Sequence, residues 1–318
     1  MRLRDPTLIS PIKTLDCSYN SDLSVILKHH RIAICQKSEN KSNDIKIYEE
    51  HKAQPTIVIS NAHNSRISAL FEFDHGILVS FSYSEKLIKF WSIRKYDYKL
   101  LHTLDAKDIN SVYRLRTKLV TIHFKNDDTR ESTLHLWNVH HFENKWEKEL
   151  KFRGEVSNIL ELEGKDLIVV SYIDETPEDR IKNDGVLFIN SLTFQVVSNI
   201  KHNGMTDDYP LIQFDNNRVL MGGGNIFLID LEKKTIESIS KTDCRCLTKL
   251  NDEIVLFEGI RKRYFLDVNN KKVGCSSKEE EGRCLYQLVM INDKEFYGIN
   301  DYNQVIKYII KEIDLNKY

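Results

Sequence analysis

The sequence predicts an all-β fold made of seven copies of one unit, because an apolar strand that ends in a bulky residue recurs along its 318 residues. The seven strands end at Tyr48, Trp91, Trp137, Ile189, Ile229, Leu266 and Ile309. These ends lie 37 to 52 residues apart, and a period of roughly 40 to 45 residues is typical of β-propellers with one blade per repeat. We therefore expect a seven-bladed β-propeller.

Each unit contains three other strands: two apolar strands precede the recurring one, and a more polar strand follows it. The first strands begin at Leu23, Ile67, Ile109, Val156, Tyr209, Cys246 and Cys284. The second strands begin at Arg31, Gly76, Lys118, Asp166, Arg218, Glu253 and Glu295. Strands that are buried on both faces are continuously apolar, while half-exposed strands alternate. The pattern predicts four-stranded antiparallel blades with a partly solvated outer strand.

We expect one β-propeller domain that spans residues 1–318. Its blades are approximately residues 21–60, 65–105, 108–153, 155–201, 208–241, 244–275, and 283–310 together with 7–15. A propeller avoids unpaired sheet edges by closing on itself. The apolar residues 7–15 belong to no other blade, so we expect them to close the seventh blade as its outer strand. The alternative is a flexible N-terminal arm.

The composition favours an intracellular protein. Hydrophobic residues make up 41% of the chain, yet no stretch approaches the roughly 20 apolar residues of a membrane helix. The N-terminus shows no apolar signal segment, and six cysteines without short spacings indicate a reducing compartment. The net charge of −1 favours neither nucleic acid nor anionic membranes as partners. We expect a cytoplasmic location, with the nucleus as the alternative.

Two units of the chain resemble WD-repeat β-propellers at residues 67–93 and 134–139, and the resemblance in period and strand order covers nearly all of the chain. Blades of that family place Gly-His before the first strand, where this chain has Ala62-His63, and end the third strand with Trp-Asp. The pairs at that second place here include Trp91-Ser92, Trp137-Asn138, Ile229-Asp230 and Leu266-Asp267. The resemblance is strong in architecture and degenerate in motif.

The family forms a hydrogen-bonded ladder within a blade from the His, a strand Ser or Thr, a turn Asp and the Trp. The resemblance implies that His63, Ser80 or Ser82, and Trp91 supply three of these members in the second blade. The fourth is missing from the sequence, because Ser84-Glu85 occupies the turn where the family has Asp.

The segment Gly222-Gly223-Gly224 has the composition of a phosphate-binding loop. A nucleotide site of that kind needs a helix N-terminus after the loop to hold the phosphate. Here one apolar strand precedes the glycines and another follows them. We interpret them as a tight hairpin turn.

The cysteines admit a metal site as an alternative to buried thiols. Cys244 and Cys246 share one face of a strand, Cys284 repeats Cys246 one blade later, and Cys275 could complete a cluster. Thiolate sites for zinc usually contain CxxC pairs, and the sequence has none. We expect structural thiols and no metal or other cofactor.

Other polar and aromatic candidates have ordinary structural interpretations. The pairs His29-His30 and His140-His141 have no HExxH spacing, and we expect them in surface turns. Trp146 is expected to pack at the edge of the third blade, with an exposed contact residue as the alternative. No GxSxG elbow or other spaced nucleophile and base is present. The sequence therefore predicts no catalytic residues and a protein that is not an enzyme.

The connections between second and third strands differ most between the units. In an antiparallel blade they emerge on one rim, together with the blade-to-blade connections. The long ones are residues 35–44, 123–132 and 172–184, and the charged blade connections 201–208 and 274–282 fall on the same rim. Hairpin loops normally have 2 to 5 residues, and longer loops are usually functional or disordered. Unconstrained sequence drift would also produce such loops.

We expect a non-catalytic protein-interaction scaffold or adaptor, a monomer within a larger complex, that contacts other proteins through this loop rim. The expected contact residues are Lys125, Arg130, Asp174, Glu175, Arg180, Lys182, Arg261, Lys262 and Arg263. One alternative is a reader of phosphorylated or acidic peptides, since arginine offers bidentate geometry. Another is a propeller enzyme with a site in the central channel. Fold does not imply function, so each of these assignments is an analogy.

Overall fold

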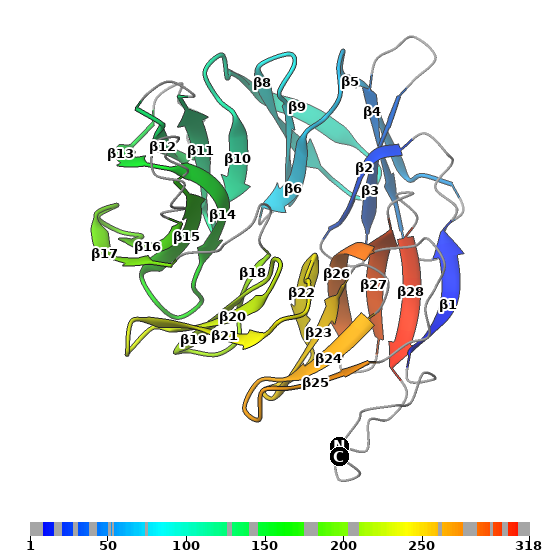
Figure 1. Ribbon diagram of the computed structural model, residues 1–318. Coiled ribbons are helices and arrows are strands. Elements are labelled where there is room, and N and C mark those ends of the chain that lie inside the picture. The colour runs from blue at the N-terminus through cyan, green and yellow to red at the C-terminus, as the bar shows by residue number, and fades with distance from the viewer. Residues whose placement is uncertain are drawn as a thin grey trace. The chain divides into compact units, whose positions relative to one another are not determined.

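A computed structural model describes residues 9–15, 21–27, 31–37, 43–49, 52, 54–73, 76–125, 129–139, 146–174, 184–202, 210–259, 263–275, 285–292, 295–300 and 305–310. The strands form seven four-stranded sheets, one for each repeat, and the fold is the seven-bladed β-propeller that the sequence predicts. The chain divides into two compact units, residues 15–153 and residues 1–14 with 154–318. Figure 1 labels the strands of both units.

The unit of residues 15–153 contains three consecutive sheets. The first sheet has β2 (Ser21–Ile26), β3 (Ile32–Lys37), β4 (Asn43–Tyr48) and β5 (Ile57–His63). The second has β6 (Ala69–Phe73), β7 (Ile77–Ser82), β8 (Leu87–Ile93) and β9 (Tyr98–Asp105). The third has β10 (Ser111–Arg114), β11 (Lys118–Phe124), β12 (Glu131–Asn138) and β13 (Lys148–Arg153). In each sheet the strands lie in chain order, and each strand pairs antiparallel with the next. These three sheets are the first three blades.

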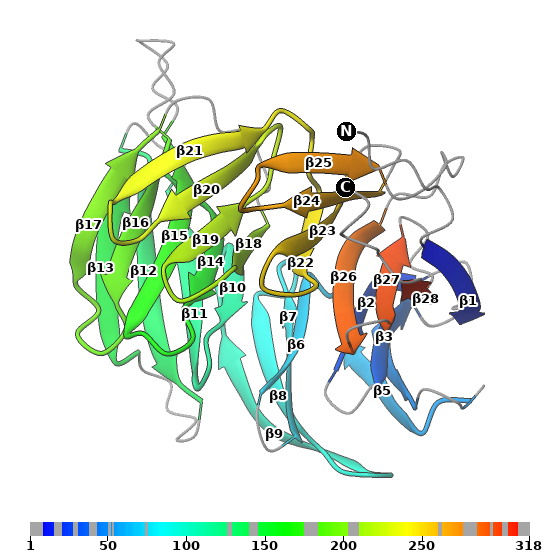
Figure 2. The same ribbon diagram turned by 90° about the horizontal axis from the view of Figure 1, so that it is seen from below.

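The other unit contains four sheets. Their strands are β14 (Glu155–Glu161), β15 (Leu167–Ile173), β16 (Gly185–Asn190) and β17 (Val196–Lys201), then β18 (Leu211–Gln213), β19 (Arg218–Met221), β20 (Ile226–Asp230) and β21 (Thr235–Ser240), then β22 (Cys246–Lys249), β23 (Ile254–Glu258), β24 (Arg263–Asp267) and β25 (Lys272–Cys275), and finally β26 (Leu285–Asn292), β27 (Glu295–Asn300) and β28 (Val305–Ile310) with β1 (Ile9–Leu15). Figure 2 gives a second view of these strands.

The last sheet combines strands from both ends of the sequence. Its order is β1-β28-β27-β26, which places β1 next to β28 at the outer edge. This is the position that the sequence predicts for residues 7–15. The contribution of this strand to the stability of the fold stays a prediction, and the deletion experiment in the Discussion tests it.

Burial along the strands explains why this sequence forms four-stranded blades. The second strands β7, β15 and β23 are buried along almost their whole length. The outer strand β13 alternates between half-buried and exposed residues. Central strands covered on both faces need continuous apolar sequence, whereas outer strands tolerate alternation. The described residues contain no α-helix.

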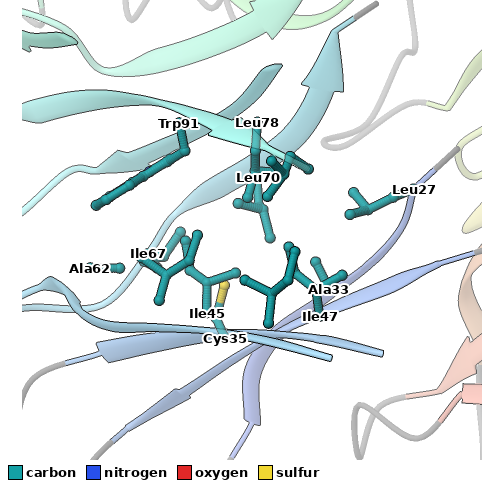
Figure 3. Close-up of a cluster of buried hydrophobic side chains, with 13 residues drawn as sticks. Leu27, Ala33, Cys35, Ile45, Ile47, Ala62, Ile67, Leu70, Leu78 and Trp91 are labelled. Atoms are coloured by element: carbon teal, nitrogen blue, oxygen red, sulfur yellow. The ribbon is translucent and has the colours of Figure 1, made fainter. Parts of the chain in front are cut away.

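Apolar side chains fill the space between consecutive sheets. In Figure 3, Ile45 and Ile47 from β4 face Leu70 and Leu78 of the second blade, with Trp91 beside them. Full burial of an aliphatic side chain stabilises the folded state by roughly 1.5 to 3 kcal/mol. Packing between blades is therefore the main source of stability in this unit.

Equivalent clusters join the four sheets of the other unit. Each pair of neighbouring sheets shares one cluster of buried side chains. Phe188 and Phe227 belong to the first cluster, Leu220 and Phe257 to the second, and Phe265 and Phe296 to the third. The fifth and sixth blades each contribute to two of these clusters, one on either face, so buried side chains join all four blades in sequence.

Membrane-spanning helices are absent from the residues that the structure describes. No helix among these residues is long and apolar enough to cross a lipid bilayer.

Candidate functional site

The expected loop rim begins at the connections between second and third strands. Residues 38–42 separate β3 from β4, residues 125–130 separate β11 from β12, and residues 174–184 separate β15 from β16. Strands extend further than the sequence analysis expected, so the first two connections are close to ordinary hairpin length. Only the connection in the fourth blade is much longer.

Lys125 and Arg130 lie at the two ends of the connection in the third blade. Lys125 is exposed and its Nζ lies 3.9 Å from a carboxylate oxygen of Glu131, the first residue of β12. Arg130 is half-buried and has a positive φ of 45°, a conformation that costs energy for a residue other than glycine, asparagine or aspartate. Both residues occupy the rim where the sequence places them, and their role in partner binding stays a prediction.

Asp174 is buried rather than exposed, which corrects its assignment as a surface contact. Asp174 and Asp184 flank the long connection, and both side chains are buried. Tyr172 lies nearby, and its hydroxyl donates to Asn199 Oδ1 at 2.9 Å. Burial raises the pKa of Tyr172, and the negative charges of Asp174 and Asp184 raise it further. Glu175, Arg180 and Lys182 lie outside the described residues.

Arg263 is also buried, with an exposed fraction of 1%, which corrects its assignment as a rim contact. It is the first residue of β24 and pairs directly with Glu258, the last residue of β23. Its Nε lies 3.2 Å from a carboxylate oxygen of Glu258, and its Nη2 donates to the hydroxyl of Tyr308 at 3.0 Å. The guanidinium of Arg263 therefore forms its contacts inside the protein and is not presented on the surface. Arg261 and Lys262 lie outside the described residues.

The hydrogen-bonded ladder of the second blade is complete. Trp91 Nε1 donates to Ser80 Oγ at 2.9 Å, and Ser80 Oγ lies 2.9 Å from His63 Nε2. His63 Nδ1 lies 2.5 Å from Glu85 Oε2, and the N–H of Asn64 donates to Glu85 Oε1 at 2.8 Å. Glu85 thus takes the place of the missing turn Asp, which corrects the expectation of a three-member ladder. The serine is Ser80.

The proton positions in this ladder follow from its charges. Burial opposes ionisation of Glu85, but the N–H of Asn64 and the ring of His63 outweigh it and hold the pKa of the carboxyl below its ordinary value. Burial lowers the pKa of His63 despite Glu85. The histidine is therefore neutral at pH 7, with Nδ1–H donating to Glu85 and Nε2 accepting from Ser80.

This Ser–His–Glu arrangement has the connectivity of a catalytic triad, but a substrate cannot reach it. The side chains of Ser80 and His63 are buried completely, and Ser80 Oγ is already occupied by Trp91. A nucleophile must reach a substrate carbonyl. The arrangement therefore supports the blade and offers no reactive surface.

The third blade retains part of the same ladder. Trp137 Nε1 donates to Thr121 Oγ1 at 2.8 Å, so a strand threonine replaces Ser80. Trp146 packs edge-on against Trp137, with 5.9 Å between ring centroids, and stacks on His135 at 4.1 Å. It packs at the edge of the blade as expected and remains 42% exposed. Its use as a contact residue stays a prediction.

Blades four to six share a different device at the turn after the third strand. Asn190, Asp230 and Asp267 end these strands, and the side-chain oxygen of each accepts a backbone N–H from the third residue after it. The fourth residue after each one, namely Phe194, Lys234 and Lys271, has a positive φ between 54° and 60°. The aspartates that remain from the Trp-Asp pairs therefore cap hairpin turns.

The glycine tract forms the hairpin connection between β19 and β20, as the sequence predicts. Gly223 exchanges two backbone hydrogen bonds with Cys244, at 3.0 and 2.7 Å. A Cβ on Gly222 would lie 2.6 Å from Pro210 Cγ and 2.8 Å from Cys244 Sγ. Glycine is needed here because the next connection packs directly against the backbone.

The described cysteines are buried thiols. The thiol of Cys244 donates weakly to the carbonyl of Cys246 at 3.5 Å, and burial raises its pKa well above the ordinary value. Within the described ranges, no three His, Cys, Asp or Glu side chains gather as a metal site would require. The structure does not describe the side chains of Cys275 and Cys284, nor the pairs His29-His30 and His140-His141.

Comparison with known proteins identifies the class of fold. No protein-family model matches the chain, and no curated protein matches it. The chain is similar in structure to the WD40 repeats of RRP9 (14% identity, 95% of this chain and 98% of that chain covered, TM-score 0.68), to U3-55K (13%, 94% and 98%, 0.67), and to the WD40 domain of Neurospora crassa Pan2 (8%, 98% and 98%, 0.69). These identities show a WD40-like propeller fold and nothing about function.

Proposed function

We propose that this propeller is a non-catalytic protein-interaction scaffold that presents the charged connection of its fourth blade to a partner protein. The proposal includes a cytoplasmic location and a monomeric chain within a larger complex. The observation that carries it is the difference between this connection, residues 174–184, and the short turn between β7 and β8 at residues 83–86. A long connection on a rigid blade is a common place for binding residues.

The base of the connection supports the proposal because it is firmly held. Asp174 and Asp184 are buried at its two ends, and Tyr172 anchors β15 to Asn199 of β17. A Cβ on Gly185 would lie 2.6 Å from the hydroxyl of Tyr172, so the strand that follows the connection packs closely. Rigid attachment lowers the entropic cost of ordering a segment on binding.

The test shortens residues 175–183 to Gly-Ser-Gly and keeps Asp174 and Asp184, because these two side chains are buried. Replacement from Tyr172 onward would remove buried groups and confuse folding with binding. We expect an unchanged melting temperature and at least about tenfold weaker binding to the main cellular partner, which corresponds to roughly 1.4 kcal/mol. Affinity purification with mass spectrometry identifies the partner, and titration measures the affinity.

Charge variants separate this surface from general electrostatics. Arg130, Arg180 and Lys182 are replaced together by Ser, and the loss of affinity should shrink as salt rises. The matched control replaces three exposed lysines at or beside the turns between third and fourth strands of the fifth and sixth blades, Lys233, Lys234 and Lys272, by Ser, because these turns lie away from the loop rim. Equal loss in the control, or no loss on shortening the connection, would mean that the partner uses another surface.

The two alternative functions stay predictions. Recognition of phosphorylated or acidic peptides was expected through Arg130, Arg180, Arg261 and Arg263. Arg263 is buried, and Arg180 and Arg261 lie outside the described residues. In the scaffold test, a partner that binds only when phosphorylated would favour that alternative. An enzyme with a channel site would be favoured by turnover that survives replacement of residues 175–183.

A further inference from the structure

The turn between β8 and β9 presents an unusually exposed aromatic side chain. Residues 94–97 form the turn, and it is closed by the N–H of Arg94, which donates to the carbonyl of Asp97 at 2.8 Å. Tyr96 is 63% exposed, the largest value for an aromatic side chain in the described part of the chain. A tyrosine in this position provides a large contact area at little entropic cost.

Lysines from two blades lie over this ring. Lys95 Nζ lies 5.1 Å from the ring centroid of Tyr96, and Lys52 Nζ, from the connection between β4 and β5, lies 5.5 Å from it. Lys52 also pairs with Glu49 at 2.7 Å. Cation–π contacts of this kind orient the ring and the two ammonium groups together. The surface is therefore assembled by the first and second blades.

The cations around this turn differ from the other surface cations of the unit in their pairing. Arg94, Lys95 and Lys99 are exposed, and none of them forms an ion pair with another described residue. Most other surface lysines of this unit are neutralised. Examples are Lys107 with Asp105, Lys118 with Glu147, Lys125 with Glu131 and Lys151 with Glu149. We call Lys52, Arg94, Lys95, Tyr96 and Lys99 the basic patch.

Exposed aliphatic side chains continue the basic patch along β9. Leu100 is 44% exposed and Leu101 is 37% exposed. The pairing register skips Leu101, which marks a β-bulge in this outermost strand. A bulge discourages another strand from pairing with the edge. Contact here would therefore be made through side chains.

We propose that the basic patch is a second docking surface, which binds an acidic segment of a partner protein that also carries aliphatic side chains. Carboxylates would pair with Arg94, Lys95 and Lys99, and the aliphatic groups would cover Leu100 and Leu101. Tyrosine and arginine beside apolar area are characteristic of binding hot spots. The exposed leucines favour a protein partner over nucleic acid, whose backbone offers charge alone.

Within the second blade, the basic patch lies at the end opposite to the turn between second and third strands. The turn at residues 83–86 follows β7, and the turn at residues 94–97 follows β8. Because β7 and β8 are antiparallel, these turns lie at opposite ends of the second blade. A partner on the basic patch therefore does not cover the turn between β7 and β8 of the same blade.

The experiment measures binding of a fluorescein-labelled peptide with three repeats of Glu-Glu-Glu-Leu to the full chain by fluorescence polarisation. The variants are Arg94→Ser, Lys95→Ser and Lys99→Ser together, and Tyr96→Ser alone. The control is the Ser variant of Lys234, Lys241 and Lys272, which removes the same charge. We expect at least tenfold weaker binding for the triple variant, several-fold weaker binding for Tyr96→Ser, and little change for the control.

A second probe distinguishes the partner classes. Glu-only peptide of equal length should bind several-fold more weakly than the leucine-containing peptide, and a labelled oligothymidylate of 12 nucleotides should bind more weakly still. The proposal is overturned if the wild type does not bind the peptide, if the control loses as much affinity as the triple variant, or if the oligonucleotide binds more tightly. All substituted side chains are exposed, so we expect every variant to fold. Circular dichroism melts check that each variant is folded.

Discussion

Arg263 and Glu258 form an ion pair inside the protein, with 3.2 Å between Arg263 Nε and Glu258 Oε2 and only 2% and 3% of their side chains exposed. The guanidinium also lies 4.3 Å from the ring centroid of Tyr308, which belongs to the neighbouring seventh blade. A buried charge is costly unless it is paired and hydrogen-bonded. The pair itself lies within the sixth blade at the cost of desolvating two charges, and the contacts of Arg263 with Tyr308 link this blade to the seventh.

Replacement of one charged residue of the pair should lower the free energy of unfolding much more than replacement of both. We expect Arg263→Ala to lower the free energy of unfolding by about 3 to 5 kcal/mol, because the buried carboxylate of Glu258 loses the cation beside it. The double variant Glu258→Leu with Arg263→Met should lose less, because no charge remains. Urea denaturation checks both. A double variant at least as unstable as Arg263→Ala would contradict this account.

The second-blade ladder predicts that Glu85 cannot be replaced by a neutral side chain without loss. Glu85→Gln puts an amide donor against the ring N–H of His63 or the N–H of Asn64, so one of these two donors loses its acceptor. We expect the free energy of unfolding to fall by about 1 to 3 kcal/mol. Glu85→Asp restores the family residue and should retain more stability than the Gln variant. A Gln variant as stable as the wild type would show that the ladder is dispensable.

Acidification should destabilise the protein through one buried and two half-buried histidines. Burial lowers the pKa of His63, His135 and His202 in the folded state from the ordinary value of 6.5. As the pH falls below 6.5, the unfolded chain binds protons that the folded chain does not yet bind, so the free energy of unfolding decreases. Glu85, whose folded pKa is lowered from 4.5, adds a loss in the same direction at lower pH.

Denaturation midpoints between pH 7.5 and 5.5 measure this effect. The variant His63→Gln should be less stable at pH 7.5 and should show a shallower decrease toward pH 5.5, since one titrating group is gone. Stability that rises on acidification over this range would contradict the assignment of neutral histidines.

Deletion of residues 1–16 tests the closing strand. The deletion removes β1 and exposes the edge of β28, so we expect a loss of several kcal/mol, roughly the contribution of several buried apolar side chains. Deletion of residues 1–6 retains β1 and serves as the control. If melting and solubility are unchanged after the longer deletion, the N-terminal segment is an arm.

The positive φ of Lys234 predicts a stabilising substitution. Lys234 is exposed and has a φ of 54°, a conformation that asparagine adopts more readily than lysine. Lys234→Asn should raise the free energy of unfolding by about 0.5 to 1 kcal/mol. Lys241→Asn, an exposed position with ordinary φ, should change it by less than about 0.5 kcal/mol. Thermal denaturation of the two variants compares them directly.

The blade count and strand order could be predicted because buried strands require apolar runs, and seven such runs recur with one period. Glu85 was not expected in the ladder because the family has an aspartate at this turn, whereas a side chain one methylene longer reaches His63 from the same turn. Loop lengths were overestimated at residues 38–42 and 125–130 because polar residues can continue a strand when the neighbouring strand pairs with them.

Arg263 and Asp174 were misplaced because charge alone was taken to indicate the surface. A signal was present for Arg263: Glu258 and Arg263 carry opposite charges at the two ends of one hairpin, where cross-strand pairing places them opposite each other. The burial of Asp174 had no such signal in the sequence.

The capped turns of blades four to six show how this fold can persist while its repeat motif is lost. Asn190, Asp230 and Asp267 each use atoms within four residues, whereas the ladder of the second blade needs residues 63, 80, 85 and 91 at once. A local cap survives any substitution outside its own turn, but one substitution breaks the ladder. A blade can therefore keep its hairpin geometry without the tryptophan-based ladder, and a substitution that breaks the ladder of one blade leaves the caps of the others intact.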